Sequence, residues 1–369
     1  MAFDPQKYRS RITRSRRRYK ITGRFEEPDR VPIRMSAGGS YWSWLHGANI
    51  RDYYLDIDTE IEVQLKGMEW AFEQLRDDRT GCGFHAEVGP IGEALLWDKP
   101  IERPDNTSPW IVPWVRTLED IERFEAPDPA QSKGVQWALE RREEMREKVA
   151  RMGLERLGMG GGVGIHPPLS CACAVAPADR VYEWMYTAPE HVHMLFRKCF
   201  DAFCALVDYM DRVNGAKEHT TLGLADDNSA FVSPAMYKEF VFPYNKALYD
   251  RYGAKERHFH ADGPNNQHFA MYANEMKLTH MDIGGWSDIA IAKKHLAGKV
   301  VMSGGLNCRD LYGTFEEAKP AIERAIRIGA PGGGYIFAIG GETYVGVNPD
   351  TLIATVKYAK KIGKHPIAL

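Results

Sequence analysis

Two histidines, His258 and His260, stand two residues apart within the stretch 257–263 (RHFHADG). Side chains two apart on a β-strand point to the same face, as two ligands of one metal ion must. Imidazole is a common metal ligand, so the pair predicts a metal site. A hydrogen-bonded pair at the protein surface is the structural alternative, and the spacing by itself leaves both open.

Three carboxylates stand where predicted strands end. Asp226 and Asp227 follow a short apolar strand over 221–225, and Asp282 lies near the end of a strand over 278–283. Carboxylates at the carboxyl end of a parallel strand can bind a cation, orient a substrate or act as acid and base. Helix capping explains one such acid, but two acids followed by an amide exceed what one cap requires. We therefore predict that the three carboxylates are catalytic.

Cys308 and Glu342 also follow predicted strands, and either side chain can complete a metal site. Two imidazoles and one carboxylate leave an open position for substrate on zinc. We place Cys308 among the substrate-binding residues, where its thiol is also an alternative metal ligand. A buried structural thiol is the other interpretation of Cys308.

Two glycine-rich stretches have different predicted roles. The loop 36–44 carries three large rings, Tyr41, Trp42 and Trp44, which we predict to wall an apolar substrate; packing in the core is the structural alternative. The stretch 159–165 lacks both the context of a dinucleotide-binding fold and the Lys-Ser/Thr of a phosphate loop. It predicts a strand edge that a ligand or another backbone approaches closely.

Helical and strand patterns alternate through the second half of the chain and position these residues. The helices are predicted over 189–214, 233–252, 266–275, 287–296, 315–328 and 351–361, and the strands end near His260, Ile283, Cys308 and Ile339. Repeats of this length imply a parallel sheet, and their number favours a closed (β/α)8 TIM barrel, class α/β, over an open sheet. The carboxyl ends of the strands form the active-site face of a barrel, so the predicted residues would surround one mouth.

The composition of the 369 residues is that of a globular protein, with 44% hydrophobic and 27% charged residues and a net charge of −2. This charge gives no general attraction to nucleic acid or to an anionic membrane, so we expect neither as a partner. The basic run 9–20 lacks the apolar segment of an export signal. We interpret residues 1–27 as a basic N-terminal extension and residues 28–369 as a single barrel domain. Six cysteines without a paired framework indicate reduced thiols in a cytoplasmic protein.

Three motifs carry a resemblance to a known family. They are Pro28-Asp29-Arg30-Val31-Pro32, the stretch 233–244 (SPAMYKEFVFPY) and the stretch 329–335 (GAPGGGY). In this order they resemble the uroporphyrinogen decarboxylase superfamily, which comprises decarboxylases and zinc-dependent methyltransferases that act with corrinoid proteins, coenzyme M or tetrahydrofolate. The resemblance runs from about residue 20 to residue 364, and it implies a TIM barrel independently of the strand count.

The chain departs from both branches of that superfamily. Where the decarboxylases carry a loop resembling M-R-Q-A-G-R, this chain has 34–39 (RMSAGG), with Gly39 in place of the second arginine. A porphyrin would lose charge pairing for its carboxylates there. The methyltransferases carry H-x-C and a later cysteine, where this chain has His258-x-His260 and Gly341-Glu342. The resemblance therefore implies His258, His260 and Glu342 as the metal ligands, with Cys308 as the alternative to Glu342. These harder ligands leave more positive charge on a metal, which favours activation of an oxygen or methoxy substrate over a thiolate.

The sequence therefore predicts a metal-dependent methyltransferase or demethylase. It would move a methyl group between a small methoxylated or methylamine-type substrate, a corrinoid protein and tetrahydrofolate, with zinc as the metal and cobalamin or tetrahydrofolate as the methyl carrier. A cofactor-free decarboxylase or lyase acting on a non-porphyrin acid is the alternative, and a non-catalytic binding module of the same fold is the third interpretation. We expect a homodimer from the fold.

Overall fold

The computed structural model describes residues 3–367, which form two compact units. The first unit contains the chain up to Phe84, the short piece Arg156–Gly158 and the chain from His260 onward. The second unit contains His85–Glu155 and Met159–Phe259. Strand β7 (Glu256–Ala261) therefore begins in the second unit and ends in the first.

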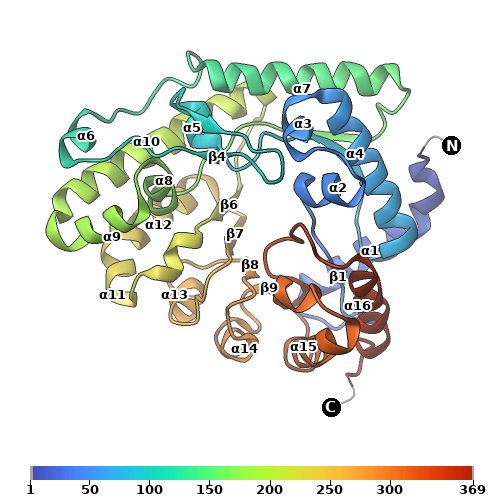
Figure 1. Ribbon diagram of the computed structural model, residues 1–369. Coiled ribbons are helices and arrows are strands. Elements are labelled where there is room, and N and C mark those ends of the chain that lie inside the picture. Colours follow the sequence, from blue (N-terminus) through green and yellow to red (C-terminus); the bar gives the residue numbers. More distant parts are fainter. Residues whose placement is uncertain (1–2, 368–369) are drawn as a thin grey trace. The chain divides into compact units, whose positions relative to one another are not determined.

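Parallel strands form the centre of the first unit (Figure 1). Their order is β1-β10-β9-β8, and their bounds are β1 (Ile33–Arg34), β8 (His280–Ile283), β9 (Val301–Leu306) and β10 (Tyr335–Ile339). The register pairs Ile33 with Phe337 and Tyr335 with Met302. Four of the five residues of β10 are buried, as expected for a parallel strand that is covered on both faces.

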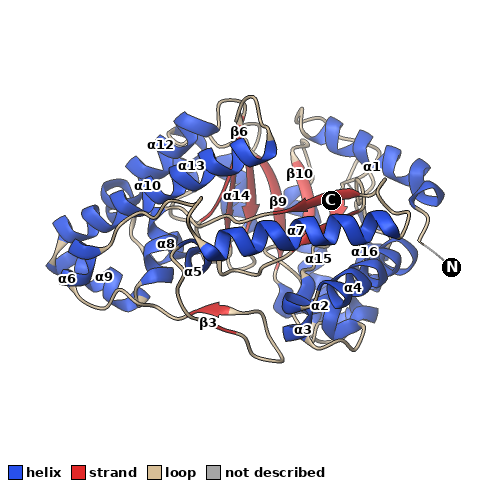
Figure 2. Cartoon of the chain, turned by 90° about the horizontal axis from the view of Figure 1, so that it is seen from above, coloured by secondary structure: helices blue, strands red, loops and turns tan. Residues whose placement is uncertain are grey.

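Helices cover these strands. In the first unit they are α1 (Arg9–Thr22), α2 (Gly39–Leu45), α3 (Ile50–Leu55), α4 (Ile57–Trp70), α13 (Phe269–Asn274), α14 (Ile289–Leu296), α15 (Phe315–Gly329) and α16 (Pro349–Ile362), with the short 3-10 helices η1 (Pro5–Tyr8) and η5 (Cys308–Leu311) and the π-helix η2 (Ala71–Leu75). Helix α15 starts with a capping box between Thr314 and Glu317. Its apolar face then packs against β9, β10, α14 and α16 (Figure 2).

The basic N-terminal segment is a helix that ion pairs hold in place. Arg18 of α1 lies 2.7 Å from Asp29 and 3.0 Å from Asp78, and Arg30 lies 2.6 Å from Asp78. The Asp78 side chain is almost fully buried and also accepts a hydrogen bond from the backbone of Ile33. Because a buried carboxylate is stable only when it is paired, these arginines fix α1 against the start of β1.

The second unit is mostly helical. Its elements are α5 (Gly92–Leu96), β3 (Ile101–Glu102), β4 (Trp110–Ile111), α6 (Leu118–Arg123), α7 (Lys133–Arg151), α8 (Pro168–Val175), α9 (Ala178–Thr187), α10 (Pro189–Asn214), β6 (Thr221–Ala225), η3 (Asp227–Phe231), α11 (Pro234–Met236), η4 (Tyr237–Val241) and α12 (Phe242–Tyr252). Two strands, β2 (Gly83–Ala86) and β5 (Gly158–Gly161), contain residues of both units. Helix α10 packs against α8, α9 and α12 (Figure 2), and β6 neighbours the start of β7.

The predicted elements agree with the structure except at one place. The prediction that 233–252 is helical is confirmed over Pro234–Tyr252; within it, π-helix η4 lies next to Pro243, which has no N–H to donate to the preceding turn. The prediction of a loop over 36–44 is wrong, since α2 begins at Gly39. There the burial of Tyr41 and Trp42 outweighs the local preference of Gly38-Gly39 for a loop.

None of the helices among the described residues is long and apolar enough to cross a membrane. All six cysteines are free thiols, as predicted.

Candidate active site

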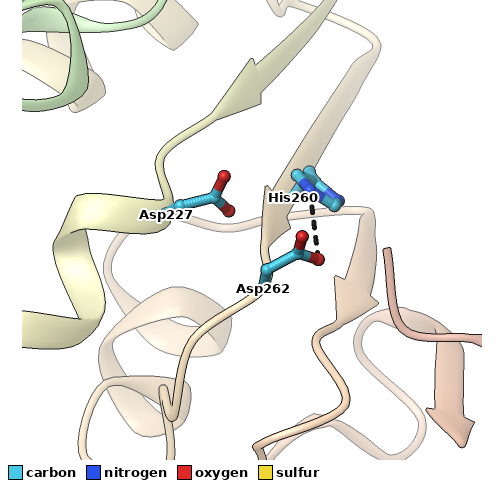
Figure 3. Close-up of side chains that lie close together, drawn as sticks. All are labelled: Asp227, His260 and Asp262. Carbon is cyan, nitrogen blue, oxygen red and sulfur yellow. Dashed lines mark ion pairs between the residues drawn. The ribbon is translucent and has the colours of Figure 1, made fainter. Parts of the chain in front are cut away.

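Side chains that follow the strands of the first unit form a group that we call the strand-end cluster: His260, Asp262, Asp282, Cys308 and Glu342. His260 is near the end of β7, and its Nδ1 atom lies 2.9 Å from Asp282 Oδ2 on β8. Its Nε2 atom lies 3.4 Å from Asp262 Oδ1, the ion pair drawn in Figure 3. One imidazole is therefore held between two carboxylates that are each about one-third exposed.

Cys308 and Glu342 complete the strand-end cluster. Cys308 is buried, its Sγ accepts a hydrogen bond of 3.4 Å from the backbone of Tyr344, and its pKa is raised by burial and by nearby Glu342 and Asp262. The hydroxyl of Tyr344 donates to Asp262 Oδ2 at 3.1 Å. A thiol in this setting stays protonated unless a cation replaces the proton.

Glycines leave room for the acids of this cluster. A Cβ atom at Gly38 would lie 2.6 Å from Glu342 Oε2. One at Gly341, which has a φ of +86°, would lie 2.5 Å from Asp262 Oδ1. Both contacts are too short for a real side chain, so glycine at these two positions allows the carboxylates to approach the backbone.

The predicted ligands have different surroundings. His258 is in the second unit, where its Nε2 lies 3.1 Å from Glu256 Oε2. Figure 3 labels three residues of types that could hold a metal ion: Asp227, His260 and Asp262. Of these, His260 and Asp262 belong to the first unit. The ligand set of His258, His260 and Glu342 stays a prediction.

The predicted substrate rings are mainly packed inside the first unit. Tyr41 and Trp42 are 1% and 8% exposed and meet edge to face at 5.5 Å, whereas Trp44 is 39% exposed. Tyr41 is close enough to Cys308 for the thiol to influence its charge state: burial and then Cys308 raise the pKa of Tyr41. Contact of these three rings with a substrate also stays a prediction.

The second unit contains a buried cluster at the end of β6. Asp226 is fully buried, and its two oxygens accept hydrogen bonds from Ser170 Oγ at 2.6 Å and from Asn245 Nδ2 at 2.9 Å. Burial raises the pKa of Asp226 to about 6 despite these two donors, and Asp227 adds to the rise. Asp227 is partly exposed at the start of η3. The two predicted catalytic acids thus differ: neutral donors hold Asp226 in place, and Asp227 is more open.

Sequence reasoning missed a histidine–glutamate pair in the same unit. Glu93 of α5 is fully buried, and its Oε1 lies 2.8 Å from His166 Nδ1 and accepts from the His166 backbone N–H at 2.7 Å. The available signal was an acid inside the apolar helix 92–96 (GEALL), since acids are almost never buried without a partner.

The glycine-rich stretch 159–165 has the predicted close approach by another backbone. A Cβ at Gly161 would lie 2.8 Å from the backbone N of Ala86. A Cβ at Gly92 would lie 1.8 Å from the carbonyl oxygen of Gly164, so the loop lies directly on the start of α5. This prediction is confirmed.

The position where the decarboxylase-type loop would carry its second arginine is closed. Gly39 begins α2, and a Cβ there would lie 1.9 Å from the ring of Tyr53, which is fully buried. Any side chain at this position would need Tyr53 to move.

The chain is similar to known proteins over most of its length. The family model described as Uroporphyrinogen decarboxylase (URO-D) matches residues 17–362. A uroporphyrinogen decarboxylase from Geobacter metallireducens is 25% identical over 269 residues, 68% of this chain and 72% of that protein. One from Shewanella loihica is 24% identical over 291 residues, 76% of this chain and 74% of that protein.

A solved structure, a methyltransferase from Methanosarcina mazei, superposes with a TM-score of 0.71 at 14% identity and covers 94% of this chain and 98% of that one. At this identity the likeness concerns the fold. Together with the parallel strands and their covering helices, it confirms the predicted (β/α)8 barrel class.

Proposed function

The chain belongs to the uroporphyrinogen decarboxylase family, and we propose that it is a metal-dependent methyltransferase of that family. The observation that carries this proposal is the placement of His260 between Asp282 and Asp262. A histidine that ligates a metal almost always donates its other ring N–H to a carboxylate or carbonyl, which fixes the ring and raises its basicity. Asp282 at Nδ1 of His260 provides such a partner and leaves Nε2 for a cation.

The donors around His260 fit a transition-metal ion. Asp262, Glu342 and Cys308 offer oxygen and sulfur from the same strand ends, and zinc accepts both together with imidazole nitrogen. Asp282 Oδ1 is buried and has no hydrogen bond in the part of the chain that the structure describes. A bound metal would supply Lewis-acid polarisation of a substrate heteroatom. His260, with Asp262 and Glu342, would hold it, and the prediction adds His258.

The fully buried ring of Tyr53 beside Gly39 argues against porphyrin decarboxylation. An arginine that pairs with substrate carboxylates would require Tyr53 to move if it stood at Gly39, because Tyr53 occupies the space of its Cβ. Removing such an arginine leaves a carboxylate without its bidentate partner. A smaller substrate with fewer charges, such as a methoxylated or methylamine-type compound, fits this change better.

The methyl carrier is part of the same proposal. The neighbour from Methanosarcina mazei is a methyltransferase by name, which supports transfer chemistry on this fold. We propose a corrinoid protein, or tetrahydrofolate, as the acceptor or donor of the methyl group, a small molecule as substrate and a homodimer as the assembly.

Decarboxylation of a non-porphyrin acid is the second candidate. The relatives from Geobacter metallireducens and Shewanella loihica carry the decarboxylase name, and at 24–25% identity they favour this chemistry without fixing it. In that case His260 and its neighbours would bind a substrate carboxylate, and no metal would be needed for turnover.

Metal analysis and methyl transfer test the proposal together. Purified protein, the variant His260→Ala and the control His191→Ala are analysed by plasma mass spectrometry; His191 pairs with exposed Glu122 at 3.5 Å and takes no part in the cluster. We expect about one transition-metal ion per chain in wild type and control and a loss in His260→Ala. Methyl transfer from methoxylated aromatics to reduced cobalamin is expected in the samples that contain the metal and is expected to be lost in His260→Ala. Full metal content in folded His260→Ala, or full turnover after chelation, would contradict the proposal and favour the decarboxylase.

A further inference from the structure

The first unit contains a surface pocket that the proposed metal chemistry does not use. It lies between helices α15 and α16, which pack side by side (Figure 1), and residues 363–367, which follow α16. The helices contribute residues from the second half of their length, within 323–327 and 358–362. In a (β/α)8 barrel each helix runs back from the carboxyl end of its strand, so these helix ends lie away from the strand-end cluster. The pocket is therefore separate from the candidate active site.

Apolar side chains form the floor of this pocket. Ile326 is 1% exposed, and Ile362, Ile367 and the ring of Tyr358 are partly buried around it. The cavity has a volume of about 410 Å³, and small-molecule sites typically measure about 300–1,000 Å³. Burial of apolar ligand surface on such a floor stabilises a complex. The pocket can thus hold the apolar body of a small molecule.

The wall that follows α16 is held in place by the backbone. The N–H of Val31 donates to the carbonyl of Gly363 at 2.8 Å, and the N–H of His365 donates to the carbonyl of Asp29 at 3.3 Å. Residues 30 and 364 form an antiparallel bridge between the same two segments. Because these bonds fix the wall to the chain just before β1, the pocket is pre-formed, as most small-molecule sites are.

The rim of the pocket has an excess of positive charge. Three of its cations form no ion pair with any residue that the structure describes: Arg327, Lys361 and Lys364. Its one acid, Glu323, accepts a hydrogen bond from the hydroxyl of Tyr358 at 2.5 Å. Three cations against one carboxylate leave an excess of two positive charges. By contrast, Arg324 on the same helix is paired with Asp288 at 2.9 Å.

The helix dipoles account for only part of this arrangement. Arg327 and Lys361 lie in the last turns of α15 and α16, where a cation interacts favourably with the helix dipole and needs no ligand. Lys364 lies beyond the end of α16 and gains little from the dipole, yet it lines the same pocket. The dipoles also do not explain why the three cations meet around an apolar floor.

We propose that this pocket binds a small amphipathic anion, a molecule with an apolar body and a terminal phosphate or carboxylate group. The apolar body lies on Ile326 and Ile362, and the anionic group accepts hydrogen bonds from the three cations of the rim. Arginine is suited to this role, because its planar guanidinium binds two oxygens of one phosphate or carboxylate. A phosphate monoester fits best, since its charge of about −1.5 to −2 matches the excess on the rim.

Methyl NMR of the full chain, labelled at the isoleucine methyl groups, locates the ligand. The probe is decyl phosphate below the concentration at which it forms micelles. We expect shifts at Ile326, Ile362 and Ile367 but none at Ile283 and Ile339, which end β8 and β10 beside the strand-end cluster. No shifts, or shifts confined to Ile283 and Ile339, would overturn the proposal.

Three further probes separate the two parts of the ligand. Decanol keeps the apolar body without the charge, inorganic phosphate keeps the charge without the body, and decanoate exchanges the phosphate for a carboxylate. We expect decyl phosphate to bind at least about tenfold more tightly than decanol or inorganic phosphate, with decanoate in between. Tighter binding of decanoate would assign the carboxylate as the anionic group. Decanol or inorganic phosphate binding as tightly as decyl phosphate would overturn the proposal.

Variants at the rim test the role of the cations. Arg327→Gln and Lys361→Gln are each expected to lose about tenfold in affinity for decyl phosphate and to leave the affinity for decanol unchanged. The matched controls are Arg324→Gln and Lys357→Gln, exposed positions on the same two helices that do not line the pocket. Both controls should bind as wild type does. Equal losses in the controls would indicate a general attraction of anions to the surface and would overturn the proposal.

These experiments require neither a metal ion nor turnover. A protein that transfers methyl groups but binds no decyl phosphate would leave the proposed function in place and remove the pocket ligand. A protein that binds decyl phosphate at Ile326 and Ile362 but transfers no methyl group would do the opposite.

Discussion

The strand-end cluster of the first unit and the Glu93–His166 pair of the second unit use the same residue types in opposite ways. In the first unit His260 is partly exposed and has a carboxylate at each ring nitrogen. In the second unit His166 has one fully buried carboxylate, Glu93, at one nitrogen. Two open acids around an imidazole attract a cation, whereas one buried acid holds a proton on the ring. The two imidazoles are exposed to about the same extent, so the difference lies in the burial of the carboxylates and in their number.

Among the tests of this comparison, removal of the buried carboxylate of Glu93 has the largest expected effect on stability. Glu93→Ala leaves the His166 backbone N–H without its partner and removes the counter-charge of the ring. We expect a loss of about 3–4 kcal/mol in the free energy of unfolding, measured by urea denaturation. Asp282→Ala, at the partly exposed pair, is the matched variant and should lose less than about 1 kcal/mol. Equal losses of stability in the two variants would mean that the buried and the partly exposed carboxylate contribute alike, and the comparison would fail.

The pH dependence of stability tests the buried cluster next. The pKa of Asp226 is raised to about 6 in the folded protein, so the folded state binds its proton more tightly than the unfolded chain does. Stability from this group is therefore greatest below about pH 4 and is lost as the pH rises through about 6. Asp226→Asn cannot ionise, and the Oδ1 of neighbouring Asn245, which has no hydrogen bond among the described residues, can accept after a flip.

The variant should thus be more stable than wild type by about 2–3 kcal/mol at pH 8 and similar to it at pH 4. Denaturation curves at both pH values measure this. A variant that is destabilised equally at both would show that Asp226 is ionised in the folded protein throughout this range.

Metal affinity tests the strand-end cluster. Asp282→Asn keeps His260 but removes the negative charge at its Nδ1. Loss of such a supporting carboxylate typically lowers metal affinity 10- to 100-fold, which a competitive chelator titration measures. Glu93→Gln is the comparison variant and should leave the affinity unchanged. An equal loss of metal affinity in Glu93→Gln would show that the effect is not specific to the carboxylate beside His260, and the comparison would be wrong.

The smallest expected effect is at the edge of the strand-end cluster. Tyr344→Phe removes the hydroxyl that donates to Asp262 Oδ2 but keeps the ring. Because Tyr344 is 44% exposed, water can replace the hydroxyl, and we expect less than about 1 kcal/mol in unfolding and a change of a few-fold in metal affinity. A loss of metal comparable to that in His260→Ala would indicate that the hydroxyl belongs to the site itself.

The sequence pattern was sufficient to predict the bounds of an element where the element's own residues decide its structure. Helix α10 and strand β10 have the predicted bounds, because one has a long amphipathic repeat and the other a short apolar run between glycines and a loop. Helix α2 was missed, since the burial of its rings and not the local preference of its glycines decides its structure. Four residues of the strand-end cluster, His260, Asp282, Cys308 and Glu342, were named in advance because the ends of parallel strands share one edge. Asp262, which follows β7, was missed.

By itself the sequence determined the family, the barrel class and the strand that carries His258 and His260, because motif order and periodicity are properties of the chain. Only the tertiary structure decided which carboxylates flank His260 and that Tyr53 fills the space beside Gly39. It also decided that neutral donors bind both oxygens of Asp226 and that Glu93 is hydrogen-bonded to His166. Apart from Asp262, which follows His260 by two residues, these partners are between 14 and 73 positions apart in sequence. Their charge states and contacts follow from burial and distance, which no local pattern contains.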